Sequence, residues 1–192
     1  MAPKHAMSGT DPYALLKLPC RFHLDSSVIE EAFRRAAALH HPDQASGSTT
    51  SFHQLQEAAT ILRNPAKRLR HFAGASEPRS LQLPSAAAEL FPSIMKTLQQ
   101  ADHLIKKYQN SSGNLTKALM KRELLEEQNT IQNTLQQIET WHESLQQQLR
   151  NFDASETIPS SEELLELANQ FTFVQRWEQQ LRECEFTLTT LI

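Results

Sequence analysis

Glycine and cysteine are both scarce in this chain, and their scarcity narrows the possible folds. Only four of the 192 residues are glycine, too few for the tight hairpins of a β protein or for a glycine-rich phosphate-binding loop. The two cysteines, Cys20 and Cys184, lie far apart and form no C-x-x-C pair. They suggest neither a disulfide framework nor a thiolate zinc site, and this usage is typical of a reducing compartment.

Long apolar runs are missing as well. No stretch approaches the roughly 18 apolar residues that a membrane-spanning helix needs. Residues 1–10 have neither the apolar core of a secretion signal nor the arginine-rich amphipathy of an organelle presequence. We therefore expect a flexible N-terminus of ten residues on a cytoplasmic protein of bacterial type that does not contact membranes.

What the chain does contain favours helices. Leucine, glutamine, glutamate and alanine are abundant. Hydrophobic residues make up 39% of the chain and charged residues 21%, and this composition is sufficient to bury a core.

Charge is divided unevenly along the chain. Residues 1–74 hold nine basic and six acidic residues, a net charge of +3, and the remainder holds ten basic and sixteen acidic residues, a net charge of −6. This asymmetry predicts two units with separate partners, and +3 is too sparse a charge for nucleic-acid binding.

Turn signals divide residues 11–74 into four short helices. Pro19 ends the first, and Ser27 and Glu30 have the spacing of a capping box at the start of the second. Asn64 precedes a proline between the third helix and the basic fourth.

Residues 75–84 contain two prolines and no periodicity, which predicts a linker. Over residues 85–192 three long amphipathic segments joined by short loops predict a three-helix antiparallel bundle. Ser160 and Glu163 have capping-box spacing at the start of the last segment. The apolar stripe expected for the middle segment consists of Leu115, Leu119, Ile131, Leu135, Ile138, Trp141, Leu145 and Leu149.

The most informative motif is a tripeptide, His41, Pro42 and Asp43, in the loop between the second and third helices. Proline fixes its own φ and restricts the residue before it, so the loop presents the imidazole and the carboxylate at a set angle. The carboxylate can accept bidentate hydrogen bonds from a partner's arginine, and the imidazole can donate one.

The segment from residue 11 to about 72 resembles the J-domain of DnaJ-type co-chaperones. The resemblance rests on the opening Asp-Pro-Tyr-x-Leu-Leu, on the tripeptide, on Phe-Arg-Arg in the second helix and on the closing Asn-Pro-Ala-Lys-Arg. It implies that the tripeptide couples docking to ATP hydrolysis by a DnaK-type chaperone. It also implies that Arg34 and Arg35, which the periodicity places off the apolar face, meet an acidic groove on that chaperone.

The chain departs from the J-domain pattern at several positions, including Leu39, where a lysine is frequent. J-domains commonly carry extra basic residues one turn before the aromatic residue of the second helix and just after the tripeptide. Glu30, Glu31 and Gln44 stand there in this chain. Their lack of positive charge leaves two possibilities open, a dedicated chaperone with a complementary surface or weak stimulation.

A J-domain followed directly by a helical bundle is similar in layout to the HscB type of iron–sulfur co-chaperone, and residues 167–177 resemble the closing segment of that family. The resemblance implies an HscA-type chaperone partner and an iron–sulfur scaffold as client. Residues 90–105 lack the glutamates expected for the scaffold site, so another client or a non-stimulating helical scaffold remains an alternative. The residues chosen as candidate client contacts are Phe91, Met95, Phe173 and Phe186.

An enzymatic function is not expected. His40, His41, Asp43 and His53 lack the spacing of metal ligands on a helix. The chain has no nucleophile elbow, Walker loop or dinucleotide fingerprint. We therefore expect no catalytic residue, metal or resident cofactor, with ATP and any cluster belonging to the partners.

Overall fold

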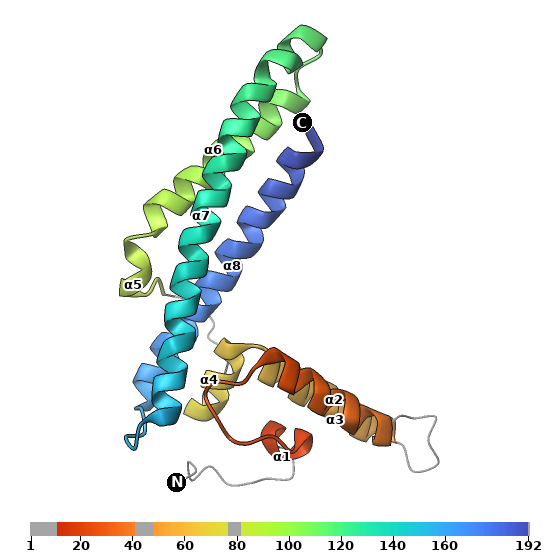
Figure 1. Ribbon diagram of the computed structural model, residues 1–192, viewed down its shortest axis with the longest axis vertical. Helices are drawn as coiled ribbons and strands as arrows, with labels where there is room; N and C mark the ends of the chain where they lie inside the picture. The colour runs from red at the N-terminus through yellow and green to blue at the C-terminus, as the bar shows by residue number, and fades with distance from the viewer. Residues whose placement is uncertain (1–10, 41–47, 77–81, 192) are drawn as a thin grey trace. The chain divides into compact units, whose positions relative to one another are not determined.

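The computed structural model describes residues 11–40, 48–76 and 82–191, and these residues form eight helices and no strand (Figure 1). The predicted all-α class is confirmed. The predicted flexible terminus and residues 77–81 of the predicted linker lie outside the described residues. The helices are α1 (Pro12–Leu16), α2 (Ser26–His40), α3 (Thr49–Arg63), α4 (Pro65–Ala73), α5 (Ser85–Ala88), α6 (Phe91–Gln109), α7 (Asn114–Ala154) and α8 (Ser161–Leu191).

Contacts divide the chain into two units. The first, here called the N-terminal unit, consists of Met1–Leu81 and Leu145–Asn169, and the second, the bundle unit, of Gln82–Ser144 and Gln170–Ile192. The sequence did not predict that the end of α7 and the start of α8 group with the first four helices. None of the described helices is both long enough and apolar enough to cross a membrane.

The four predicted N-terminal helices pack around one apolar core. It combines Tyr13 of α1 with residues spaced by three or four along α2 and α3, such as Ile29 and Leu62, all at most 3% exposed. That spacing places them on one face of each helix. The shared core holds α1, α2 and α3 against one another, and α4 packs on α3.

Local capping fixes where the short helices begin and end. The Asp11 side chain accepts a hydrogen bond from Ala14 N at 3.3 Å at the start of α1, and Asn64 Oδ1 accepts one from Lys67 N at 3.1 Å at the start of α4. After α4, Gly74 adopts the left-handed conformation (φ 65°), in which glycine has no side-chain clash.

A buried arginine completes the core of the N-terminal unit. Arg68 of α4 is 1% exposed, and its guanidinium donates to the carbonyl oxygens of Phe22 at 2.9 Å and Leu62 at 2.5 Å. Burial is the main influence on its pKa and lowers it, while the negative charge of Asp153 acts in the opposite direction. Arg68 therefore joins the α1–α2 connection to the end of α3 through one charged group.

The end of α7 binds the same α1–α2 connection. The Asp153 carboxylate accepts hydrogen bonds from the backbone N–H groups of Phe22 and His23, each at 2.8 Å. The Phe152 ring lies edge-on to Phe22 with centroids 5.9 Å apart. The start of α8 adds Asn169, whose Oδ1 accepts from Arg70 Nη2 at 3.2 Å. These contacts explain why Leu145–Asn169 groups with the N-terminal unit.

In the bundle unit, α6, α7 and α8 pack side by side around a second core (Figure 1). Hydrogen bonds from Gln128 to Thr189 and from Gln132 to Glu185 show that α7 and α8 run antiparallel, since the partner's number falls as the first rises. The Trp141 and Trp177 rings lie 6.1 Å apart between these two helices. The three long helices are as predicted, and the one-turn α5 was not predicted.

The predicted apolar stripe of α7 is wrong at its beginning. Leu115 and Leu119 are 76% and 71% exposed. The buried positions instead continue the heptad series backward from Ile131, which includes Met120 and Leu124. Leu115 and Leu119 do not belong to that series, so they lie off the buried face.

Candidate functional site

The first candidate site lies on the exposed face of α2. Ile29 and Ala32 are buried at 1% and 2% exposure, while Arg34 and Arg35 are exposed on the other side of the helix. The prediction that both arginines point away from the apolar face is confirmed. Two guanidinium groups are therefore available on this surface, as binding to an acidic partner would require.

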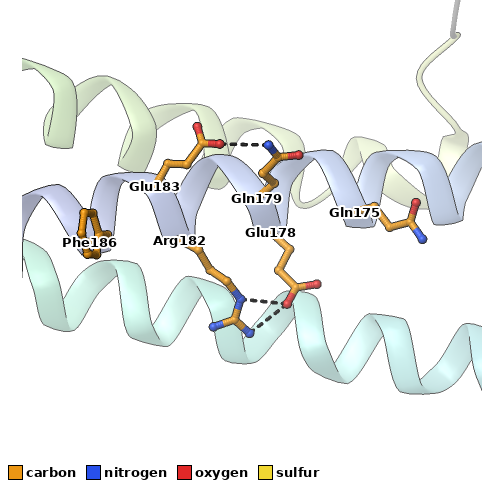
Figure 2. A pocket seen from close by; sticks show the side chains of 6 residues that line it. All are labelled: Gln175, Glu178, Gln179, Arg182, Glu183 and Phe186. Atoms are coloured by element: carbon orange, nitrogen blue, oxygen red, sulfur yellow. Dashed lines mark hydrogen bonds and ion pairs between the residues drawn. The ribbon is translucent and has the colours of Figure 1, made fainter. Parts of the chain in front are cut away.

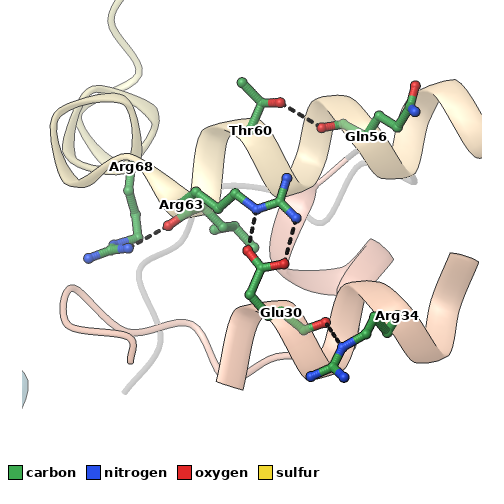
Figure 3. Close-up of polar contacts among 7 residues, drawn as sticks. Glu30, Arg34, Gln56, Thr60, Arg63 and Arg68 are labelled. Carbon is green, nitrogen blue, oxygen red and sulfur yellow. Dashed lines mark hydrogen bonds and ion pairs between the residues drawn. The ribbon is translucent and has the colours of Figure 1, made fainter. Parts of the chain in front are cut away.

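Glu30, one of the two unexpected carboxylates on α2, is occupied by an ion pair. Figure 3 shows its carboxylate accepting from Arg63 Nε at 2.6 Å and Nη2 at 2.9 Å. The Arg63 guanidinium also lies 4.9 Å from the centroid of the Phe33 ring. The hydrogen bond from Arg63 is the largest influence on the pKa of Glu30 and lowers it. Within α2 and α3, the charge of Glu30 is thus matched by an α3 arginine, whereas Arg34 donates to the Glu30 backbone carbonyl at 3.4 Å.

Glu31 is placed differently. Its carboxylate lies 3.8 Å from Arg35 Nη1, one helical turn away, and both side chains are at least 65% exposed. Such exposed pairs are weak and are screened by salt. A partner's acidic group can compete with Glu31 for Arg35 at little cost.

The tripeptide His41, Pro42 and Asp43 lies outside the described residues. The described helices on either side are α2, which ends at His40, and α3, which begins at Thr49. The roles assigned to these three residues stay predictions.

The second candidate site is a groove between α6 and α8 in the bundle unit, with a volume of about 710 Å³. Three of the four predicted client contacts line it: Phe91, which is 38% exposed, the half-buried Met95, and Phe173, which is 9% exposed. Trp177 lies among them, with its ring centroid 6.1 Å from that of Phe91 and 5.2 Å from that of Phe173. An apolar floor of aromatic rings and a methionine is typical of an adaptable protein-binding surface.

The fourth predicted client contact, Phe186, does not line this groove. It is 73% exposed on the outward face of α8. Figure 2 shows it beside a row of polar side chains that includes the Glu178–Arg182 ion pair, at 2.8 Å. The structure therefore groups Phe91, Met95 and Phe173 and separates Phe186 from them.

Sequence reasoning missed Trp177 as a groove residue because its heptad position predicts only burial. Asp102, Arg176 and Glu183 also line the groove and give it a charged rim. Among the residues that the structure describes, no cluster of three or more His, Cys, Asp or Glu side chains could hold a metal ion.

Comparison with known families identifies the domain that carries the first candidate site. Residues 11–71 match the family model of the DnaJ domain. Together with the four-helix arrangement of α1–α4, this match establishes that the front of the chain is a DnaJ domain, as the resemblance predicted.

Two known proteins named HscB are similar to the chain. The co-chaperone protein HscB homolog of Bordetella avium (strain 197N) is 32% identical over 73 residues, which are 34% of this chain and 44% of that protein. The match thus spans less than half the length of the curated relative. The solved structure of the chaperone HscB from Vibrio cholerae superposes with a TM-score of 0.56 at 15% identity, covering 93% of this chain and 99% of that one. At this identity the structural match establishes a shared helical fold.

Proposed function

We propose that this protein is a J-domain co-chaperone that binds the ATP form of a DnaK- or HscA-type chaperone and accelerates its ATP hydrolysis. The observation that carries this proposal is the DnaJ-domain match over residues 11–71. The exposure of Arg34 and Arg35 on α2 supports it, because long-range attraction by surface charges raises association rates with an acidic partner. Asp43 supplies the acceptor for a chaperone arginine, and no bond of the protein itself is made or broken.

We further propose that the groove lined by Phe91, Met95 and Phe173 holds a client, and that this client is an iron–sulfur scaffold protein. The HscB-like fold supports this assignment, as does a groove lined by aromatic rings and a methionine in which Phe91 is exposed. The cluster and ATP belong to the partners, and a cytoplasmic location follows from this role as part of the same proposal.

Asp43→Asn is expected to abolish the stimulation. The variant keeps the size of the side chain but removes the charge that a partner's arginine recognises. The measurement is single-turnover ATP hydrolysis by the host's DnaK- and HscA-type chaperones with and without the full-length protein. Glu57→Gln, which removes an exposed carboxylate from α3 of the same domain, is the matched control and should stimulate normally.

Equal stimulation by Asp43→Asn and the unmodified protein would contradict the proposed role of the tripeptide. The specific reason to consider a non-stimulating interaction protein is the presence of Glu30 and Glu31 on α2, where J-domains commonly carry basic residues. Failure of the unmodified protein to stimulate any host chaperone would favour that second function.

Phe91→Ser is expected to weaken binding of the host's iron–sulfur scaffold at least about tenfold, the effect of losing about 1.4 kcal/mol at an apolar anchor. Phe91 is already partly exposed, so the substitution should not unfold the bundle. Phe186→Ser is the matched control. It removes a phenylalanine that is more exposed than Phe91 and lies on α8 outside the groove. The measurement is isothermal titration of the scaffold with the full chain, since Leu145–Asn169 packs with the N-terminal unit.

A larger loss of affinity with Phe186→Ser than with Phe91→Ser would place the client on the outward face of α8 instead. If the unmodified chain does not bind the scaffold, the client belongs to another class of protein.

A further inference from the structure

A carboxylate occupies a core position of the bundle unit. Glu127 of α7 is 8% exposed and belongs to the buried series of that helix. Successive members of the series are separated by four or three residues, the spacing of an inward-facing heptad stripe. The members of the series are Met120, Leu124, Glu127, Ile131, Thr134 and Ile138.

The two polar members of this series differ in their hydrogen bonding. Thr134 Oγ1 donates to the Thr130 carbonyl at 2.8 Å and lies 3.4 Å from Thr97 Oγ1 of α6. In contrast, Glu127 Oε1 is buried and has no hydrogen-bond partner among the residues that the structure describes. Burial raises the pKa of Glu127. A buried carboxylate oxygen without a donor destabilises a fold, and such exceptions in natural chains are expected at functional or strained sites.

Glu127 lines a hollow of about 340 Å³ whose remaining lining comes from α6. This volume is at the lower limit of small-molecule sites, so it suits one extended side chain better than a cofactor. The lining also includes the apolar side chain of Leu104, and Gln99 and Gln100, whose amide oxygens are able to accept hydrogen bonds. The hollow thus combines one buried negative group with neutral acceptors and an apolar wall.

We propose that this hollow binds an arginine side chain of a partner protein, with the guanidinium donating to Glu127. A guanidinium is weakly hydrated and carries five donors, so it loses less on leaving water than an ammonium and can reach the glutamine amides as well. Lys96 and His103 also line the hollow, but both are exposed, and solvent screens their repulsion more than it screens the attraction of a buried carboxylate. The net charge of −6 after residue 74 attracts a basic partner.

The test uses the full chain and a small probe, n-butylguanidinium chloride, with n-butylurea as the neutral probe of similar shape. In ¹⁵N NMR titrations, the guanidinium probe should shift the amide resonances of Gln100, His103 and Glu127. Its affinity should exceed that of the urea by about tenfold. Glu127→Gln keeps the size of the side chain and removes its charge, so it should remove this preference. No chaperone or client is present, so failure here is distinguishable from failure of the proposed function.

Three binding results would each overturn the proposal: equal binding of the two probes, an unchanged preference in Glu127→Gln, or tighter binding of n-butylammonium than of n-butylguanidinium. Glu127→Leu gives a separate measurement. Replacing an unpaired buried carboxylate with an apolar residue should raise the melting temperature. A lower melting temperature would show that the carboxylate stabilises the bundle, and would also overturn the proposal.

Discussion

Replacing Arg68 with methionine is expected to lower the free energy of unfolding of the N-terminal unit by about 3–5 kcal/mol. Arg68 is 1% exposed and donates to the carbonyl oxygens of Phe22 and Leu62. Hydrogen bonds from a charged donor contribute about 1.5–3 kcal/mol each. Methionine fills most of the volume but leaves both carbonyl oxygens without this donor. Urea unfolding followed by circular dichroism and amide hydrogen exchange in α1–α4 measures the change.

Arg68→Lys separates charge from geometry. Lysine keeps the positive charge but lacks the planar fork that reaches two acceptors. We therefore expect its free energy of unfolding to lie between that of the unmodified protein and that of the methionine variant. If the methionine variant unfolds at the same urea concentration as the unmodified protein, the apolar core alone holds the four helices together.

Asp153→Ala is expected to cost about 2 kcal/mol in the same unit. The variant loses both hydrogen bonds, at 2.8 Å, from the backbone N–H groups of Phe22 and His23. Because Asp153 is exposed, hydrogen bonds to water replace part of the stabilisation that the variant loses. The amides of Phe22 and His23 should exchange about 30 times faster, the factor that corresponds to 2 kcal/mol.

Asp153→Asn provides the graded control, because a carboxamide offers one acceptor oxygen in place of two. It should give faster exchange at one of the two amides and a smaller loss of stability. Unchanged exchange at both amides in Asp153→Ala would show that the end of α7 does not bind this connection in solution.

Local rules predicted much of the fold. The second capping box forms as predicted: Ser160 N donates to Glu163 Oε2 at 2.8 Å, and Glu163 N donates to Ser160 Oγ at 3.2 Å. The hydrogen bonds that Ser160 N and Ser160 Oγ donate to Glu163 Oε2 lower the pKa of Glu163. Both residues lie within one turn of each other, so their sequence spacing alone determined the outcome.

The first capping box was wrong for a tertiary reason. α2 begins at Ser26, one residue before Ser27, and both carboxylate oxygens of Glu30 accept from Arg63. Arg63 is 33 residues away along the chain, so no local pattern could identify it as the partner. For the candidate sites, helical spacing predicted the exposure of Arg34 and Arg35, but only the packing of α6 against α8 separates Phe186 from the groove residues.

The positions of the tryptophans allow unfolding of the bundle unit to be followed separately by fluorescence. Trp141 and Trp177 are the chain's two tryptophans, and both belong to the bundle unit. Emission from the indoles therefore reports on the surroundings of that unit alone, whereas far-ultraviolet ellipticity averages over every helix. A mismatch between the two signals during denaturation would reveal that the N-terminal unit and the bundle unit melt as independent cooperative blocks.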